Sequence, residues 1–234
     1  MKLYHLKMKL KQNKFIKGLY DKLFGNKHAE EEEYAKRQAL KENGVDLLET
    51  IERSLSNTNA RFFLAYGSLL GMVRDGHFMG HDNDIDYAIW IDDSFSWNDL
   101  EQAMNQVGLK KKKQFVFRGE CMEQTYQKGV LTVDFFRHIE DNNESFSYAF
   151  YRKDGYIYNS QYEYHARAAI TKKIPGVTTM TASGVQFHIP SNAEEHLAII
   201  YGAGWRVPDP NWQPGDGAEL RYFGDEIAIL EYSH

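Results

Sequence analysis

The sequence predicts an α/β (α+β) fold in which helices flank one mixed β-sheet. Three observations lead to this prediction. Apolar residues recur at helical spacing between positions 40 and 55, an apolar strand that begins with alternating acids follows near position 84, and short β-type runs separated by turn residues follow from position 114. The chain has 234 residues, enough for one sizeable core and too few for two independent domains of ordinary size.

Residues 1–27 differ in composition from the domain that we expect over 28–234. Seven lysines precede Gly25 against one acid, Asp21, with apolar residues interleaved. A basic amphipathic helix that lies on an anionic membrane has this pattern, and an arm that packs its apolar side on the domain is the alternative. No apolar run approaches the ~20 residues of a membrane span, no signal peptide is visible, and Cys121 has no partner for a disulfide. We therefore expect a cytoplasmic protein whose arm is a candidate for peripheral contact with the inner face of the membrane.

The first element of the domain is predicted to be an amphipathic helix over 30–55 that covers a sheet. Glu30 to Glu33 suit its first turn, and the polar run 56–59 ends it. Its apolar stripe consists of Leu40, Leu47, Leu48, Ile51 and Leu55. Gly44 is the one interruption of the pattern.

The stretch 62–91 is predicted as strand, Gly67-Ser68 turn, short helix over about 69–74, loop and strand. Residues two apart in a strand share a face. Asp84 and Asp86 therefore lie on one face, and Ile85, Tyr87 and Ile89 pack on the other. Two neighbouring carboxylates repel each other unless a cation or a proton lies between them, and a hard divalent ion with oxygen ligands is the simplest occupant.

The remaining elements are predicted from caps, turns and alternation. A second helix begins at Ser96 or Asn98 and ends at Gly108. Lysines 110–113 form either a solvated face or, near a phosphate site, part of an anion site. Strands are predicted over 115–117, 122–127, 130–138 and 145–152, and Asp154-Gly155 predicts a hairpin into a strand over 156–158. In the tail, a strand over 185–189 precedes a helix capped by Ser191-Asn192, and a proline-containing loop follows.

A third acid, Asp134, lies inside an apolar strand. A lone acid there is costly to bury unless it is paired or bound to a metal. If its strand lies beside that of Asp84 and Asp86, three carboxylates converge next to Gly67 and Ser68. Glycine permits close backbone approach, and the serine hydroxyl and helix-start N–H groups can hold a phosphate. The set predicts a metal-assisted phosphoryl-transfer site.

These residues resemble the LicD family, which includes fukutin and fukutin-related protein, within the nucleotidyltransferase-fold superfamily. The resemblance covers about 61–210. It is carried by Tyr66-Gly67-Ser68-Leu69-Leu70-Gly71, Arg74, Phe78, Asp82-Asn83-Asp84-Ile85-Asp86, Val185 to Pro190, Glu195-His196-Leu197 and Tyr201-Gly202-x-x-Trp205. Met79-Gly80-His81 departs from the family's Ile-Pro-Trp-like approach to the acids, which leaves a role for His81 open.

The resemblance implies transfer of phosphocholine or a polyol phosphate, such as glycerol or ribitol phosphate, from a CDP-linked donor to a glycan hydroxyl, with CMP leaving. It implies Mg²⁺ or Mn²⁺ at Asp84, Asp86 and Asp134, with Asp82 as a further candidate ligand. Gly67, Ser68 and Arg74 would bind donor phosphate. The expected glycan is a surface polymer such as capsule, lipopolysaccharide or teichoic acid. The mild net charge of −5 does not favour a nucleic-acid partner.

Two other functions fit part of the pattern. A nucleotidyltransferase would share the metal site and release pyrophosphate from an NTP, and a non-catalytic module would bind metal or carbohydrate without turnover. An EF-hand loop is disfavoured because Tyr87 stands where that loop needs glycine. Arg137 and His138 are weaker candidates for substrate contact. A tyrosine-rich hairpin over 148–164 fits sugar stacking or, more simply, strand surface.

Overall fold

The computed structural model describes residues 26–233, and the side chains of residues 29–233. The predicted N-terminal arm lies outside the described residues, apart from the first two residues of helix α3 (Asn26–Ser56). Within the described part, no helix is long and apolar enough to cross a membrane.

A nine-stranded mixed sheet forms the centre of the domain, in the order β1-β2-β5-β4-β3-β11-β8-β7-β6. β2 and β5 are parallel, and the other described pairs of this sheet are antiparallel. The strands are β1 (Phe62–Leu64), β2 (Asp84–Ile89), β3 (Lys110–Phe117), β4 (Glu120–Lys128), β5 (Leu131–Arg137), β6 (Ile139–Asp141), β7 (Glu144–Tyr151), β8 (Glu163–Lys172) and β11 (Glu219–Tyr232). The predicted fold class, a mixed sheet flanked by helices, is confirmed.

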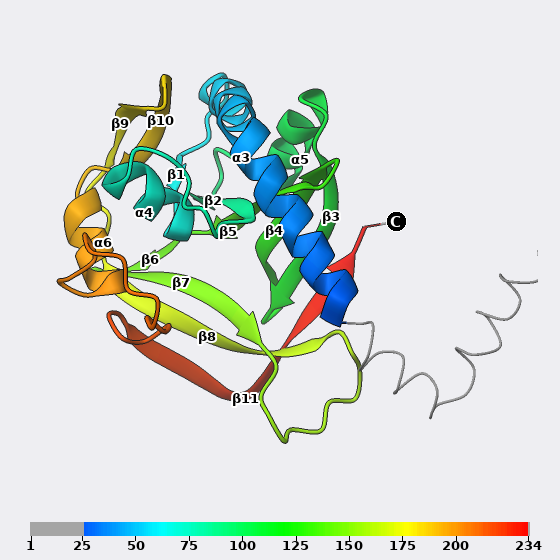
Figure 1. Ribbon diagram of the computed structural model, residues 1–234. Helices are drawn as coiled ribbons and strands as arrows, with labels where there is room; N and C mark the ends of the chain where they lie inside the picture. The colour runs from blue at the N-terminus through cyan, green and yellow to red at the C-terminus, as the bar shows by residue number, and fades with distance from the viewer. Residues whose placement is uncertain (1–25, 234) are drawn as a thin grey trace, which may run out of the picture.

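The sheet curls, so its two faces have different surroundings. Figure 1 shows α3 and α5 on one side of β2, β5, β4 and β3, while β7, β8 and β11 curl beneath the other. Across the curl, the Phe115 ring stacks on Phe150 at a centroid distance of 4.5 Å and meets Tyr164 edge-on at 5.1 Å. We call the face of β2, β5, β4 and β3 that looks into this curl the concave face.

The main core lies on the opposite face, beneath α3. The predicted stripe of this helix is buried in the main apolar cluster together with Tyr87 and Phe135, and each large apolar side chain fully buried there stabilises the fold by roughly 1.5–3 kcal/mol. The helix prediction is confirmed, although the described helix begins one turn before Glu30. The chain runs helically through Gly44, where a β-carbon would lie 3.1 Å from the Phe78 ring.

Three shorter helices and a second sheet complete the domain. α5 (Trp97–Gln106) begins at Ser96, and Ser96 and Asp99 form a capping box. α4 (Tyr66–Arg74) and α6 (Ala193–Tyr201) lie towards one end of the sheet, and β9 (Val177–Ala182) pairs with β10 (Val185–Pro190) as a separate hairpin.

Two predicted turn features are wrong in detail. Gly67 and Ser68 lie in the first turn of α4, not in a turn that precedes it. Asn192 stands before α6 but makes no side-chain cap, because its φ of −108° and ψ of 38° depart from the extended conformation that orients a cap. Its amide donates to Glu195 instead.

The strands predicted between 115 and 152 are confirmed, but the strand over 156–158 is wrong. Asp154 and Gly155 form a turn, and the chain returns to the sheet only at Glu163. The intervening tyrosines pack around buried His165, and the Tyr158 hydroxyl lies 2.6 Å from its Nδ1. β6, β8, β9 and β11 were not predicted.

Candidate active site

Three carboxylates meet on the concave face where the parallel pair β2–β5 places them. Asp86 stands directly opposite Asp134 in the register of these strands, and Asp84 is two residues earlier on the same face. One carboxylate oxygen from each lies within 4.8 Å of the others. Ile85, Tyr87 and Ile89 are buried on the core side, so the alternation inferred from the sequence is confirmed.

Burial and mutual repulsion raise the pKa values of Asp84 and Asp86. Burial is the largest cause that raises the pKa of Asp84 to about 7, followed by the negative charges of Asp134 and Asp82. Burial also raises the pKa of Asp86 well above its usual range, followed by the charge of Asp84 and then that of Asp134. Each group therefore resists ionisation unless a positive charge joins the cluster.

Asp134 has the most favourable surroundings for a negative charge. Burial raises its pKa, while a hydrogen bond donated by the Thr125 hydroxyl lowers it most among the opposing effects. The positive charges of Lys113, Lys36 and Lys112 act in the same direction as Thr125. This carboxylate is thus held in place by a neighbour on β4 and faces cations from β3 and α3.

The donor set fits a hard divalent cation. Three carboxylates supply oxygen ligands, and within residues 29–233 no ion pair joins any of them to a lysine, arginine or histidine. A divalent ion would supply the missing positive charge, and Mg²⁺ and Mn²⁺ prefer such oxygen ligands.

Helix α4 is fastened to the acid-bearing strand by Ser68. The Ser68 side chain is buried, and its hydroxyl oxygen accepts a hydrogen bond from the Asp86 backbone N–H at 3.0 Å. Its own proton remains available for a further acceptor. A β-carbon on Gly67 would lie 3.1 Å from a carboxylate oxygen of Asp82, so glycine permits this close approach. Ser68 therefore lies beside the strand that carries Asp84 and Asp86, and Gly67 lies beside Asp82.

Asp82 lies outside the group of three. Its carboxylate accepts the Met79 backbone N–H at 2.9 Å and closes the loop that leads into β2. Burial raises its pKa, while the Met79 bond and the charges of His81 and Arg74 lower it. Its charge also raises the pKa values of Asp84 and Asp86.

Arg74 and His81 line a cavity of about 580 Å³ next to α4. Arg74 follows Gly67 by two helical turns, so both residues lie on the same side of α4. The Arg74 guanidinium donates three hydrogen bonds to the Asp75 carboxylate, the shortest from Nη2 to Oδ2 at 2.7 Å. The opposite wall includes Trp212, whose indole N–H is buried with no hydrogen-bond partner among the described residues.

Several sequence candidates lie away from the acids. Arg137 is paired with Glu120. His138 is buried against Trp90, and burial lowers its pKa to about 4. An EF-hand is excluded because Asp84–Ile89 is a central strand of the sheet.

Sequence reasoning missed Thr125 and Glu123, and it named Tyr66 only as part of the family motif. Thr125 and Glu123 alternate along β4 and share the concave face with Asp134. Burial, followed by the charge of Asp134, raises the pKa of Glu123 to about 8. Tyr66 has a φ of 44°, a strained value for a non-glycine residue, and its ring packs on Phe136 at 4.8 Å. Polar residues occupy most of β4, so its sequence does not single out Glu123 or Thr125.

Comparison with known protein families gives one match that includes all of these acids. The model of the family described as LicD/FKTN/FKRP, nucleotidyltransferase domain, matches residues 59–192. This is more than half of the chain, and it runs from just before β1 to the residue that precedes α6.

Curated relatives agree with this match at low identity. Ribitol-5-phosphate transferase FKTN from Macaca fascicularis and its human counterpart are each 23% identical over 177 residues, which cover 74% of this chain and 35% of the relative. The mouse protein is 21% identical over 176 residues. The chain therefore spans about a third of the length of the curated relatives that it matches.

Proposed function

Since the chain belongs to the LicD/FKTN/FKRP family of nucleotidyltransferase domains, we propose that it is a metal-dependent transferase of phosphate-containing groups. Its donor is a CDP-linked head group, either phosphocholine or a polyol phosphate such as glycerol or ribitol phosphate. Its acceptor is a sugar hydroxyl of a surface glycan, and CMP is the leaving product. The relatives' name supports ribitol phosphate as the first donor to test.

The observation that carries the proposal is the register of β2 and β5. It sets Asp86 opposite Asp134 and brings three carboxylates together beside Ser68. Phosphoryl transfer needs positioning and charge neutralisation more than covalent chemistry from the protein. Mg²⁺ or Mn²⁺, held by Asp84, Asp86 and Asp134, supplies that neutralisation when bound.

The chain's own residues bind and orient the two substrates. We assign Gly67, Ser68 and Arg74 to the donor phosphates, because Gly67 and Arg74 line the cavity next to α4 and Ser68 bonds to the backbone of Asp86. The acceptor oxygen bonds to the phosphorus of the head-group phosphate, while the bond from this phosphorus to the CMP oxygen breaks. The acceptor proton passes to a carboxylate oxygen of Asp134, and CMP departs with the electron pair of the broken bond.

The experiment is a CMP-release assay with Mg²⁺, a set of glycan acceptors and CDP-ribitol, CDP-glycerol or CDP-choline in parallel. We expect release with one donor and at least a hundredfold loss in Asp86→Asn, which keeps the shape and removes the charge. The exposed Asp141→Asn is the matched control and should retain activity.

Full activity in Asp86→Asn, or no release with any donor, would contradict the proposal. Pyrophosphate release from an NTP would assign the nucleotidyltransferase reaction instead. Retention of metal and glycan without turnover of either kind would indicate a binding module.

A further inference from the structure

A lysine continues the row of acids across the concave face. Asp86 on β2 stands opposite Asp134 on β5, Asp134 stands opposite Thr125 on β4, and Thr125 stands opposite Lys113 on β3. Residues paired directly across a sheet point to the same face. Neighbouring strands lie about 4.8 Å apart, so the Lys113 backbone is roughly 10 Å from that of Asp134, on the side away from α4.

A bulge in β3 divides the lysine run into two halves that have different neighbours. The register shifts between Lys111 and Lys113, which leaves Lys112 as the extra residue. Such an insertion re-aims a side chain and is frequent next to active sites. Lys111 pairs with Glu101 of α5 at 2.5 Å, and Lys110 donates to Asn105 at 3.0 Å. The first two lysines are therefore engaged by α5.

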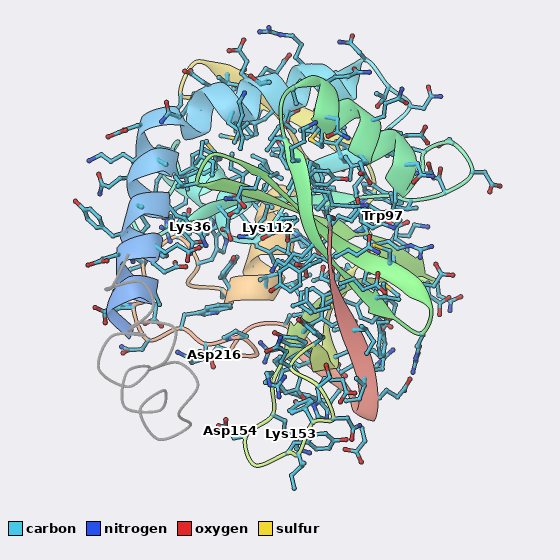
Figure 2. All side chains as sticks on the ribbon, turned by 90° about the vertical axis from the view of Figure 1, so that its right-hand side faces the viewer. Lys36, Trp97, Lys112, Lys153, Asp154 and Asp216 are labelled. Atoms are coloured by element: carbon cyan, nitrogen blue, oxygen red, sulfur yellow. The ribbon has the colours of Figure 1, made fainter. Side chains whose placement is uncertain are left out.

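Lys112 and Lys113 have no carboxylate partner among the described residues, in contrast to Lys111. Both are close enough to Asp134 for their charges to lower its pKa, and so is Lys36 of α3. Lys36 also acts on Asp84 and is only 17% exposed, but its ammonium group already forms ion pairs with Glu32 and Glu33 at 3.5 Å. In the view of Figure 2, Lys36 lies beside the helix α3 and Lys112 lies across from it, towards the strands.

We propose that Lys112 and Lys113 form a phosphate-binding site on the Asp134 side of the acids. This inference rests on the proposed function, because it assigns a second anionic group of the substrates to that active site. The two lysines offer six N–H donors and no acceptor, on a half-buried strand where charge attraction is less screened than on an open surface. Their ammonium groups can therefore bind an anionic group of a substrate.

The position of the site leaves two sources for this phosphate. The attacking and leaving oxygens lie roughly in line on either side of the transferred phosphorus. α4 lies on one side of the acids and β3 on the other, so the lysines face one of the two substrates across Asp134. The phosphate belongs either to the donor diphosphate or to an acceptor that already carries a phosphate group.

The test measures binding directly, by calorimetry on the full chain at a fixed Mg²⁺ concentration. One arm titrates CDP, as a nucleoside diphosphate, and the other titrates a hexose phosphate with CDP present. The variants are Lys112→Gln, Lys113→Gln and the double substitution. Lys110→Gln and Lys111→Gln are matched controls from the same run, and melting temperatures establish that all five variants fold.

We expect the double variant to lose about tenfold or more in affinity in one arm, as for loss of charged hydrogen bonds, while the controls stay within about twofold. Loss in the CDP arm assigns the donor diphosphate, and loss in the hexose phosphate arm assigns the acceptor. Unchanged affinity in both arms, or equal loss in the controls, would overturn the inference. Because turnover is not measured, these outcomes are separate from CMP release: lysine-dependent binding without release would reject the proposed function alone.

Discussion

Thr125 connects the fold to the chemistry at the level of a single side chain. Its hydroxyl donates to Asp134, and this bond lowers the pKa of that carboxyl against the effect of burial. A hydrogen bond of this kind orients a metal-binding carboxylate, and its loss typically reduces metal affinity 10–100-fold. We therefore expect Thr125→Val to bind Mn²⁺ about tenfold more weakly in a calorimetric titration.

Thr125→Ser keeps the hydroxyl and should bind Mn²⁺ like the wild type. This comparison separates the hydrogen bond from the shape of the side chain. Equal Mn²⁺ affinity in Thr125→Val and wild type would show that Asp134 does not depend on this donor.

At the residue scale, the sequence predicted which face of its strand a side chain occupies, but not which residue of the neighbouring strand stands opposite it. Alternation along one strand is sufficient to place Asp84 and Asp86 on one face, and the same argument places Asp134 on a face of its own strand. It does not say that Lys113 stands opposite Thr125, because that depends on how separate strands pair and on the bulge at Lys112. Whether lysines 110–113 form a solvated face or part of an anion site could therefore not be decided without knowing how β3 pairs with β4.

Gly71 shows how one residue sets the distance between two elements. A β-carbon on Gly71 would lie 2.7 Å from the His77 carbonyl oxygen and 3.1 Å from the Met79 nitrogen. Both are backbone atoms of the loop that Asp82 closes. Alanine favours a helix by about 1 kcal/mol over glycine, but here the loop must move to admit it.

We expect Gly71→Ala to lower the free energy of unfolding by about 1–3 kcal/mol, as overpacking does, and to reduce turnover because the displaced loop leads into β2. Gly80→Ala is the control in the same loop, since a β-carbon there meets nothing within 4 Å. Urea unfolding measures both variants. A Gly71→Ala protein as stable as Gly80→Ala would show that the contact is easily relieved.

At the element scale, predictions succeeded where local signals were complete. Ser96 and Asp99 form their own capping box, and glycine turns separate β3, β4 and β5. β8 was missed because its buried face is built from small residues such as Ala166 and Ala168, which also suit helices. β11 was missed because a register shift between Tyr222 and Ile227 breaks its alternation. Its pairing with β3 closes the curl and joins residues more than a hundred positions apart.

For the whole molecule, the buried acids and the buried histidines make stability depend on pH in opposite directions. Burial lowers the pKa values of His138 and His196 to about 4, so below pH 6.5 the unfolded state binds their protons more readily and stability rises with pH. The acids do the reverse, because their raised pKa values let the folded state keep protons that the unfolded state has lost. From pH 7 upward these histidines are neutral in both states, and the acids decide the slope.

We therefore expect the metal-free protein to lose stability between pH 7 and pH 8.5, through the pKa values of about 7 for Asp84 and about 8 for Glu123. Glu123→Gln removes one of these ionisations. It should flatten the fall by about 1 kcal/mol, or about 2–4 °C in melting temperature, measured by scanning calorimetry across this range. Exposed Glu219→Gln should leave the slope as in the wild type.

Mg²⁺ should raise the melting temperature most at pH 8.5, because it binds ionised carboxylates in the folded state. A melting temperature that is constant or rises from pH 7 to 8.5 without metal would contradict the strained acid cluster on which the proposed metal site depends.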